Sequence, residues 1–448
     1  MELEKWSQEK KKLATKLLTT GTFGWVYEVI GIIIKGVIPE SRIGDLCVIK
    51  SESDILAEIV GFSDDYTLLT SLEHLDGVVK GCEIYLLNTP HRIKIDESSI
   101  GSIYDGYGRA ISTNKSSVLV ANNLEKDCTE VLTGRYGLLD RIHITEPLYS
   151  GIKVIDGLLT LARGQRMGLF AGPGCGKTTL LLEIIKLTPC DIIVVGLIGE
   201  RGRELNEFFD ETKNMKEKKI IIVCATSDKG CMERSRAAFT ATAIAEAYCN
   251  NGASVLLLID SLTRFVRAQR EIGIAIGEPI GKTGLPSSVY TYLPRLLERA
   301  GNFSSGSITA IYTVLFEDRD NSDPVAEEIK SILDGHIILT NKLAERGHFP
   351  AIDVLSSLSR LMTKVVDKKH EEMARKIKML MSAYRESEFL LKIGEYKEGN
   401  DLLLDEAVSK MCDINIFTQQ SSGEFYSIEM VNIQMNKICE SGDGDGVL

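Results

Sequence analysis

One short stretch of the sequence has the residue types and spacing of a phosphate-binding loop. Residues 171–178 read AGPGCGKT, which fits Ala or Gly, four variable residues, Gly-Lys and then Ser or Thr. Glycines let such a loop wrap so that its backbone N–H groups converge on phosphate oxygens. Lys177 is expected to reach the β- and γ-phosphates, and the Thr178 hydroxyl is expected to ligate Mg²⁺. The predicted nucleotide-binding residues of the loop are Gly172, Pro173, Gly174, Cys175, Gly176, Lys177, Thr178 and Thr179.

Two acidic residues that follow apolar runs extend this chemistry from binding to hydrolysis. Asp260 ends the run VLLLID, and Glu200 comes directly after IIVVGLIG. Ligands of open α/β sheets bind at the carboxyl ends of the strands, so Asp260 is expected to orient Mg²⁺ through water. Glu200 is placed to polarise the attacking water. From the residues alone, Glu200 could instead be a surface salt-bridge partner of Arg201 or Arg203.

The elements that must position these residues follow from the apolar pattern. The segment TLLLEIIKL after the loop predicts a helix, whose N-terminus favours phosphate. After about residue 98, strand-like runs alternate with helical segments, which indicates a parallel sheet with helices on both faces. The runs are RMGLFAG, DIIVVGLIG, KIIIVCATS, SVLLLIDS, SITAIYTVL and GHIILT. The predicted fold class is therefore α/β, with a P-loop domain over residues 98–365.

The segments on either side of this domain have different patterns. Residues 22–97 contain short strands rich in β-branched residues, which suits a small β-barrel. Residues 366–448 are more charged and predict a C-terminal helical domain. Residues 1–21 combine spaced apolar positions with lysines and predict a basic amphipathic helix. We expect this helix to pack on its own domain, or to contact a membrane surface or a neighbouring subunit.

Composition and charge argue against several functional classes. The 448 residues are 44% hydrophobic and 26% charged, which is ordinary for a globular protein. The net charge of −11 argues against a broad nucleic-acid surface, which is usually basic. The ten cysteines show no Cys-x-x-Cys spacing, so we expect no zinc site. Without a signal-peptide pattern or an apolar run of about 18 residues, a cytoplasmic location is expected.

With these elements in place, nearly the whole chain resembles the type III secretion and flagellar export ATPases. These are relatives of the catalytic subunit of rotary ATP synthases. The resemblance is most specific over residues 150–365. The matching segments include GIKVIDGLLTLARGQRMGLFAGPGCGKTTLL, GLIGERGRE, VLLLIDSLTRFVRAQREIGIAIGEP, LPRLLERAGN, GSITAIYTVL, ILDGHIILTNKLAERGHFPAID and LSSLSRLM. The resemblance implies a RecA-like core, and it implies that the cofactors are ATP and Mg²⁺.

The resemblance also implies roles for residues that spacing alone could not assign. Glu200, in GER, matches the family's catalytic carboxylate, and Arg201 matches a residue that contacts phosphate or the adjacent subunit. Arg264, in SLTR, matches a phosphate-sensing arginine near the metal-orienting acid. Arg360, in SLSR, matches the arginine finger that one subunit gives to its neighbour's nucleotide. Phe349, in GHFPAID, matches the aromatic residue that stacks on adenine, where most relatives carry Tyr.

The family's assembly and partners are implied in the same way. We expect a homohexamer at the inner face of the bacterial inner membrane, held there by peripheral contacts. It would release cargo from chaperones and help to unfold it for export through an injectisome, a virulence system. The expected partners are a central coiled-coil stalk protein, peripheral stalk or regulator proteins, chaperone–effector complexes and the export gate, with no nucleic acid. The C-terminal helical domain would receive the chaperone–cargo complexes.

Two positions depart from the family's pattern. Leu285 and Ser287 stand where similar proteins usually have Tyr and Pro, in a loop expected to face the central pore of the hexamer. Cys175 stands where many relatives have Val. It is either a small filler or a thiol that makes the enzyme sensitive to alkylation, since a helix dipole and bound cations lower a thiol pKa.

Other functions stay open at this point. A flagellar export ATPase is the main alternative, because parts of the sequence fit both branches. A hexameric RNA translocase would need a basic, aromatic RNA platform, which residues 22–95 do not offer. A non-catalytic nucleotide-binding subunit would lack the carboxylate or the loop lysine that are present here. A proton-driven synthase subunit would not need the SLSR arginine in its own chain.

Overall fold

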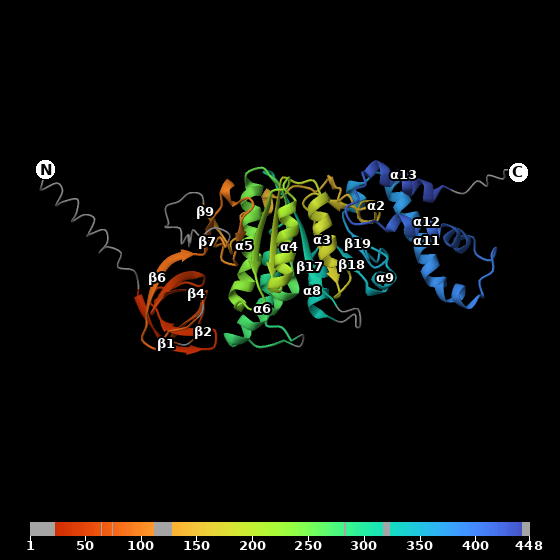
Figure 1. Ribbon diagram of the computed structural model, residues 1–448. Helices are drawn as coiled ribbons and strands as arrows, with labels where there is room; N and C mark the ends of the chain where they lie inside the picture. Colours follow the sequence, from red (N-terminus) through yellow and green to blue (C-terminus); the bar gives the residue numbers. More distant parts are fainter. Residues whose placement is uncertain are drawn as a thin grey trace, which may run out of the picture.

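The computed structural model describes residues 23–63, 65–73, 75–111, 128–281, 284–316 and 323–440. These residues form three parts that follow one another along the long axis of the molecule (Figure 1): a barrel, a sheet covered by helices, and a group of helices at the C-terminal end. The helix predicted over residues 1–21 lies outside the described residues. The barrel, the sheet core and the C-terminal helices confirm the predicted fold class.

The N-terminal part is a closed barrel whose strand order is β1-β2-β5-β4-β3-β6. All the strand pairs are antiparallel. The interior holds a compact cluster of β-branched and leucine side chains, as expected where alternate residues of each strand point inward. The strands are β1 (Phe23–Ile30), β2 (Ile33–Val37), β3 (Asp45–Lys50), β4 (Asp54–Ser63), β5 (Tyr66–Ser71) and β6 (Glu83–Pro90).

The central sheet has the strand order β19-β18-β12-β17-β15-β13-β14-β8, and β16 pairs with β17 beside this path. The six runs that we predicted as strands form β12, β13, β14, β15, β17 and β18, and their mutual pairings are parallel. The sheet is mixed rather than wholly parallel, because β16 and β19 pair antiparallel with their neighbours. The strands are β8 (Ile103–Tyr104), β12 (Arg166–Ala171), β13 (Ile192–Ile198), β14 (Ile220–Ala225), β15 (Ser254–Asp260), β16 (Gly301–Asn302), β17 (Ser307–Leu315), β18 (Gly335–Leu339) and β19 (Leu358–Ser359).

Helices cover both faces of this sheet, and each face has its own apolar core. Leu256 and Leu258 of β15 belong to one core, whereas Leu257 and Ile259 belong to the other. Alternate side chains of one strand therefore point to opposite faces, which explains the continuous apolar runs in the sequence. The helices are α3 (Lys177–Leu187), α4 (Gly202–Asn214), α5 (Cys231–Asn250), α6 (Leu262–Ala275), α7 (Ser287–Leu297) and α8 (Pro324–Ile332).

The C-terminal helices pack around the short helix α2 (Lys153–Leu158), which precedes the phosphate loop in the chain. A Cβ added at Gly157 of α2 would lie 2.8 Å from the Phe417 ring and 3.1 Å from Val431. Glycine therefore permits this close approach of helices. The C-terminal helices are α11 (Lys368–Ile393), α12 (Leu402–Thr418) and α13 (Ile428–Cys439).

Shorter elements connect these parts. They are β7 (Arg92–Lys94), η1 (Glu97–Ser99), β9 (Cys128–Glu130), η2 (Leu138–Asp140), β10 (Pro147–Leu148), β11 (Leu161–Ala162), α9 (Asn341–Glu345) and α10 (Met362–Val365). A buried ion pair between Arg236 of α5 and Glu58 of β4 joins the barrel to the central part. Among the described residues, no helix is both long and apolar enough to cross a membrane.

Candidate active site

The phosphate loop connects the end of β12 to the start of α3, as the sequence pattern predicts. Gly174 and Gly176 have φ angles of 80° and 81°, which L side chains rarely adopt. Gly176 is the N-cap of α3, and Lys177 is the first residue of that helix. Thr178 and Thr179 are exposed in its first turn. The loop therefore presents backbone N–H groups and a helix N-terminus to a phosphate.

Four charged side chains meet beside this loop. Lys177 Nζ lies 2.5 Å from Asp260 Oδ1 and 3.8 Å from Glu200 Oε1. Arg264 Nη2 lies 3.2 Å from Glu200 Oε2. Asp260 ends β15, Glu200 follows the neighbouring strand β13, and Arg264 lies in the first turn of α6. The structure thus brings together Lys177, Glu200, Asp260 and Arg264 at the carboxyl edge of the sheet.

The environment of Glu200 differs from that of an ordinary surface carboxylate. The residue is 7% exposed, and within the described part of the chain its buried Oε1 has no hydrogen-bond partner. Burial raises the pKa of Glu200 to about 7, helped by the Asp260 carboxylate and by a hydrogen bond with Glu204, while Lys177 and Arg264 act in the opposite direction. A buried carboxylate of this pKa, with an unused acceptor atom, has the properties of a general base at neutral pH.

The oxygen donors near the loop suit Mg²⁺, which binds oxygen ligands and keeps several of its waters. Asp260 accepts hydrogen bonds from Lys177 at 2.5 Å and from Thr313 at 2.6 Å, both on Oδ1. Oδ2 therefore remains available to accept from a metal-bound water, and the exposed Thr178 offers a hydroxyl oxygen in the first turn of α3.

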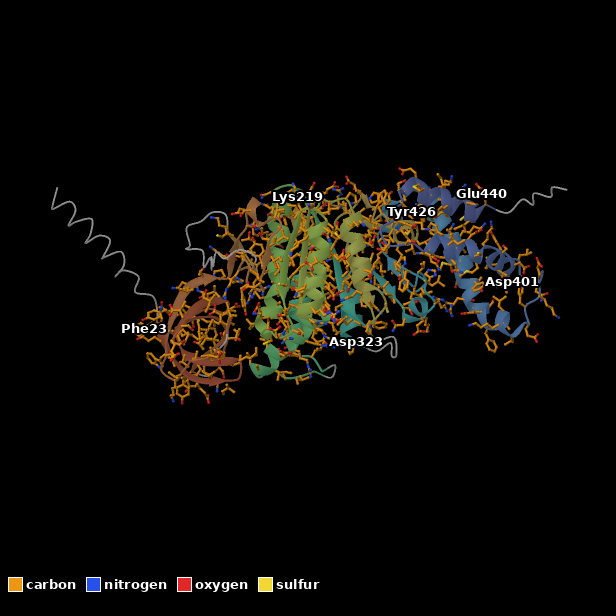
Figure 2. All side chains as sticks on the ribbon, in the orientation of Figure 1. Phe23, Lys219, Asp323, Asp401, Tyr426 and Glu440 are labelled. Atoms are coloured by element: carbon orange, nitrogen blue, oxygen red, sulfur yellow. The ribbon has the colours of Figure 1, made fainter. Side chains whose placement is uncertain are left out.

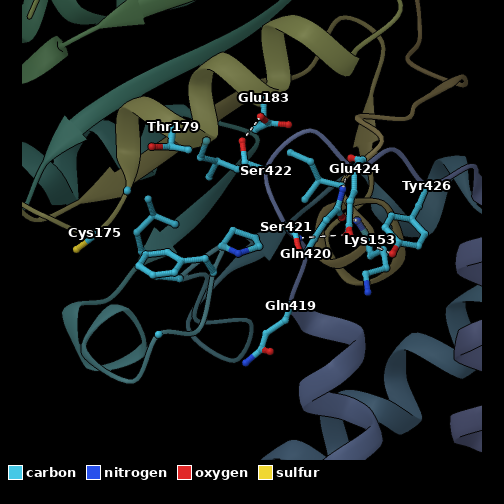
Figure 3. Close-up of a pocket in the computed structure, with 18 of the residues that line it drawn as sticks. Lys153, Cys175, Thr179, Glu183, Gln419, Gln420, Ser421, Ser422, Glu424 and Tyr426 are labelled. Carbon is cyan, nitrogen blue, oxygen red and sulfur yellow. Dashed lines mark hydrogen bonds between the residues drawn. The ribbon is translucent and has the colours of Figure 1, made fainter.

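A cavity of about 680 Å³ extends from the loop toward the C-terminal helices. Figure 3 shows Cys175 and Thr179 at its loop end and the segment from Gln419 to Tyr426 at its far end. Phe349 lines the cavity and is 46% exposed, so its ring is available for stacking. The sequence predicts Phe349 at this site, whereas no motif marks the lining residues of the C-terminal part.

The side chains of Arg360 and Arg201 are exposed at the surface. Arg360 is exposed directly after the edge strand β19, and its Nη2 donates to the carbonyl oxygen of Lys330 at 3.5 Å. The Arg201 side chain is 81% exposed, and its Nη1 lies 3.9 Å from Glu204 Oε1. Both guanidinium groups therefore point to the surface rather than into the site of their own chain.

The two positions that depart from the family pattern have different environments. Leu285 is 6% exposed and belongs to the apolar core that α5, α6 and α7 share. Ser287 is exposed at the start of α7. Leu285 therefore contributes packing under the loop, and only Ser287 changes its surface. Cys175 is buried and its Sγ donates to Asn341 Oδ1 at 2.6 Å, an environment that favours the filler role over a reactive thiol.

Two family models match the chain. The model described as the nucleotide-binding domain of the ATP synthase alpha/beta family matches residues 151–359. The model described as the T3SS EscN ATPase C-terminal domain matches residues 366–437.

Relatives and solved structures of similar length agree with these matches. The chain is 50% identical to the type 3 secretion system ATPase of Pseudomonas savastanoi pv. phaseolicola, over 90% of each chain. It is 40% identical to the flagellum-specific ATP synthase of Bacillus subtilis, over 90% of this chain and 92% of the relative. The assembled ATPase EscN from the enteropathogenic E. coli type III secretion system superposes with a TM-score of 0.86 and 42% identity, covering 93% of this chain and 100% of that one. EscN in complex with its central stalk EscO superposes with a TM-score of 0.83 and 41% identity, and it covers 93% of this chain and 100% of that one.

Proposed function

Because the chain belongs to the type III secretion ATPases of the ATP synthase alpha/beta family, we propose that it hydrolyses ATP at the subunit interfaces of a homohexamer. This hydrolysis would power chaperone release, unfolding and export of proteins through a bacterial type III secretion system. The ATPase activity itself follows from family membership. The interfacial site, the hexamer and the use of the energy are the proposed parts.

The exposed position of Arg360 is the observation that supports a site at the subunit interface. The cluster around Lys177 and Glu200 contains the loop lysine, the base and the metal-orienting acid, and Arg360 is exposed elsewhere on the same chain. Charge that develops on a transferred phosphoryl group needs a cation that is held against it. A neighbouring copy of the chain can supply that cation from its exposed Arg360.

Each residue of the site then has a distinct role. Lys177 and the loop N–H groups hold the phosphates, and Glu200 accepts the proton of the attacking water through Oε1, which accepts no hydrogen bond from the described residues. Thr178 and Asp260 would hold Mg²⁺, which neutralises phosphate charge when it is bound. Arg264 keeps Glu200 oriented through the ion pair at 3.2 Å. Phe349 would stack on adenine in the cavity.

We assign the partners by region. The C-terminal helices carry large apolar side chains that are exposed, among them Phe389 near the end of α11 and Leu402 at the start of α12, which suits docking of chaperone–cargo complexes. The match with EscN covers the whole EscN chain and 93% of this one, and EscN binds a central stalk, EscO. A similar stalk is therefore proposed here. Peripheral stalk proteins and contact with the inner membrane are assigned to the N-terminal region. The export gate is the further partner.

The test is the dependence of specific activity on protein concentration. If the site is completed in trans, dilution below the assembly range should lower the turnover per subunit, and raising the concentration should restore it to a plateau. Sedimentation at the same concentrations should show that activity follows the hexamer. Specific activity that stays constant while the protein dissociates would refute an interfacial site.

A further inference from the structure

One surface segment forms a wall of the nucleotide cavity although it belongs to the C-terminal part. Residues 419–426 lie in the connection between α12 and α13, and Gln419, Gln420 and Tyr426 line the cavity (Figure 3). Residues 421–425 are all exposed, and Tyr426 packs against the apolar core of the ATPase part. Polar contacts with the ATPase core also hold this wall, including hydrogen bonds that Ser422 and Gly423 donate to Glu183.

Lys153 makes one set of these contacts. It is the first residue of α2 and is only 4% exposed, which is unusual for a lysine. Its Nζ donates to the carbonyl oxygen of Ile416 at 3.1 Å, in the last turn of α12, where a cation also complements the helix dipole. The same ammonium group lies 4.7 Å from the centre of the Tyr426 ring, a cation–π distance. Lys153 thus contacts the helix that leads into the wall and Tyr426 at the other end of the wall.

Gln420 makes a second set of contacts, in which both its side-chain oxygen and its side-chain nitrogen take part. Its Oε1 accepts from the backbone N–H of Lys153 at 2.9 Å, and its Nε2 donates to the carbonyl oxygens of Gly151 at 3.0 Å and Glu424 at 2.8 Å. Its backbone N–H donates to the carbonyl oxygen of Phe349 at 2.9 Å. Gln420 therefore joins the wall to the loop that carries the stacking ring.

We propose that Lys153 and Gln420 are positioning residues for nucleotide binding, which hold residues 419–426 and Phe349 in place around the base. This inference rests on the proposed use of the cavity for adenine. The phosphate loop and the charged cluster lie at the other end of the nucleotide site and need neither residue. We call the contacts of Lys153 and Gln420 with this wall the clasp. Loss of the clasp should therefore weaken binding of the adenine base and leave phosphate binding and the chemical step intact.

The experiment uses the full chain and compares a ligand that contains adenine with one that lacks it. Affinities for ADP and for pyrophosphate, each with Mg²⁺, are measured by calorimetry for the wild type and for Lys153→Met, which keeps the apolar stem and removes the ammonium. We expect ADP affinity to fall about tenfold, the effect of losing one bond from a charged group, with pyrophosphate affinity unchanged. Turnover at saturating ATP should stay within about twofold of wild type, and Lys153→Arg should restore ADP affinity.

Two further variants make the result decisive. Gln420→Leu leaves the lysine in place and should give the same selective loss of ADP affinity. Lys218→Met is the matched control, because Lys218 Nζ donates to the carbonyl oxygen of Thr188 at the end of α3, outside the cavity, and its loss should change neither affinity. Equal weakening of ADP and pyrophosphate in the clasp variants, or no weakening, would overturn the proposal. Equal affinities of the wild type for ADP and pyrophosphate would instead overturn the use of the cavity for the base.

Discussion

The acidic and basic side chains beside the phosphate loop constrain one another. Lys177 contacts both Asp260 and Glu200, and Arg264 contacts Glu200 from the other side. The two acids nevertheless differ, since Thr313 donates to Asp260 while the buried Oε1 of Glu200 has no hydrogen-bond partner among the described residues. This difference suits Asp260 to orienting a metal ion and Glu200 to accepting a proton.

Substitution of Lys177 and Glu200 should separate binding from chemistry. Lys177→Ala removes the cation that faces the phosphates, so nucleotide binding and turnover should both be lost. Glu200→Ala removes only the base, so turnover should be abolished while nucleotide is retained. Equilibrium binding of ATP measured beside the hydrolysis rate checks this. Equal loss of binding in the two variants would contradict the division of roles.

The pH dependence of hydrolysis should report the ionisation of Glu200. Its pKa is raised to about 7 chiefly by burial, and only the ionised carboxylate can accept a proton from water. The value of kcat/KM should therefore fall about tenfold for each pH unit below 7 and level off above it. ATP binding to Glu200→Ala over the same range serves as the control. A flat profile between about pH 5.5 and about pH 8.5 would show that Glu200 is not the base.

At the scale of elements, the sequence predicted what depends on local pattern. Each of the six apolar runs became a strand of the sheet, because strands buried on both faces need continuous apolar residues. The loop was predictable because its glycines meet a local backbone requirement and Lys177 follows them at the spacing that phosphate binding needs. The clasp of Lys153 and Gln420 was not predictable, since 267 positions separate the two residues and neither belongs to a motif. The burial of Leu285 was not predicted, because its loop was expected to face the central pore of the hexamer.

The buried pair of Arg236 and Glu58 gives a prediction about how elements are joined. Both side chains are buried, one in α5 and one in the barrel strand β4. Arg236→Met alone leaves a buried carboxylate without its partner and should destabilise the barrel by about 3 kcal/mol or more. Arg236→Met with Glu58→Leu should recover most of this loss, because the pair is replaced by apolar groups.

Unfolding in urea can be followed through Trp25, which lies in β1, if Trp6 is replaced by Phe so that Trp25 is the only tryptophan. The expected order of midpoints is wild type, then the double variant close to it, then Arg236→Met well below. A double variant as unstable as Arg236→Met would mean that the loss does not come from the unpaired Glu58 carboxylate.

At the scale of the whole molecule, the barrel and the C-terminal helices lie at opposite ends of the ATPase core. Figure 2 shows Phe23 at the barrel end and Glu440 at the end of the C-terminal helices. A ring in which subunits pack side by side would form one layer of barrels and one layer of C-terminal helices, with the ATPase cores between the two layers. The core would then place the exposed Arg360 of one subunit against the phosphate loop of the next. This arrangement predicts that a defect in the loop and a defect in the finger complement each other.

Mixing two inactive variants tests the interfacial site most directly. Lys177→Ala lacks a working loop and keeps its Arg360, while Arg360→Ala keeps its loop and should still assemble. In rings formed from equal amounts, about a quarter of the interfaces combine an intact loop with an intact finger. The account predicts that each variant alone is inactive and that the mixture regains about a quarter of the wild-type rate. A mixture that co-assembles and remains as inactive as either variant alone would contradict it.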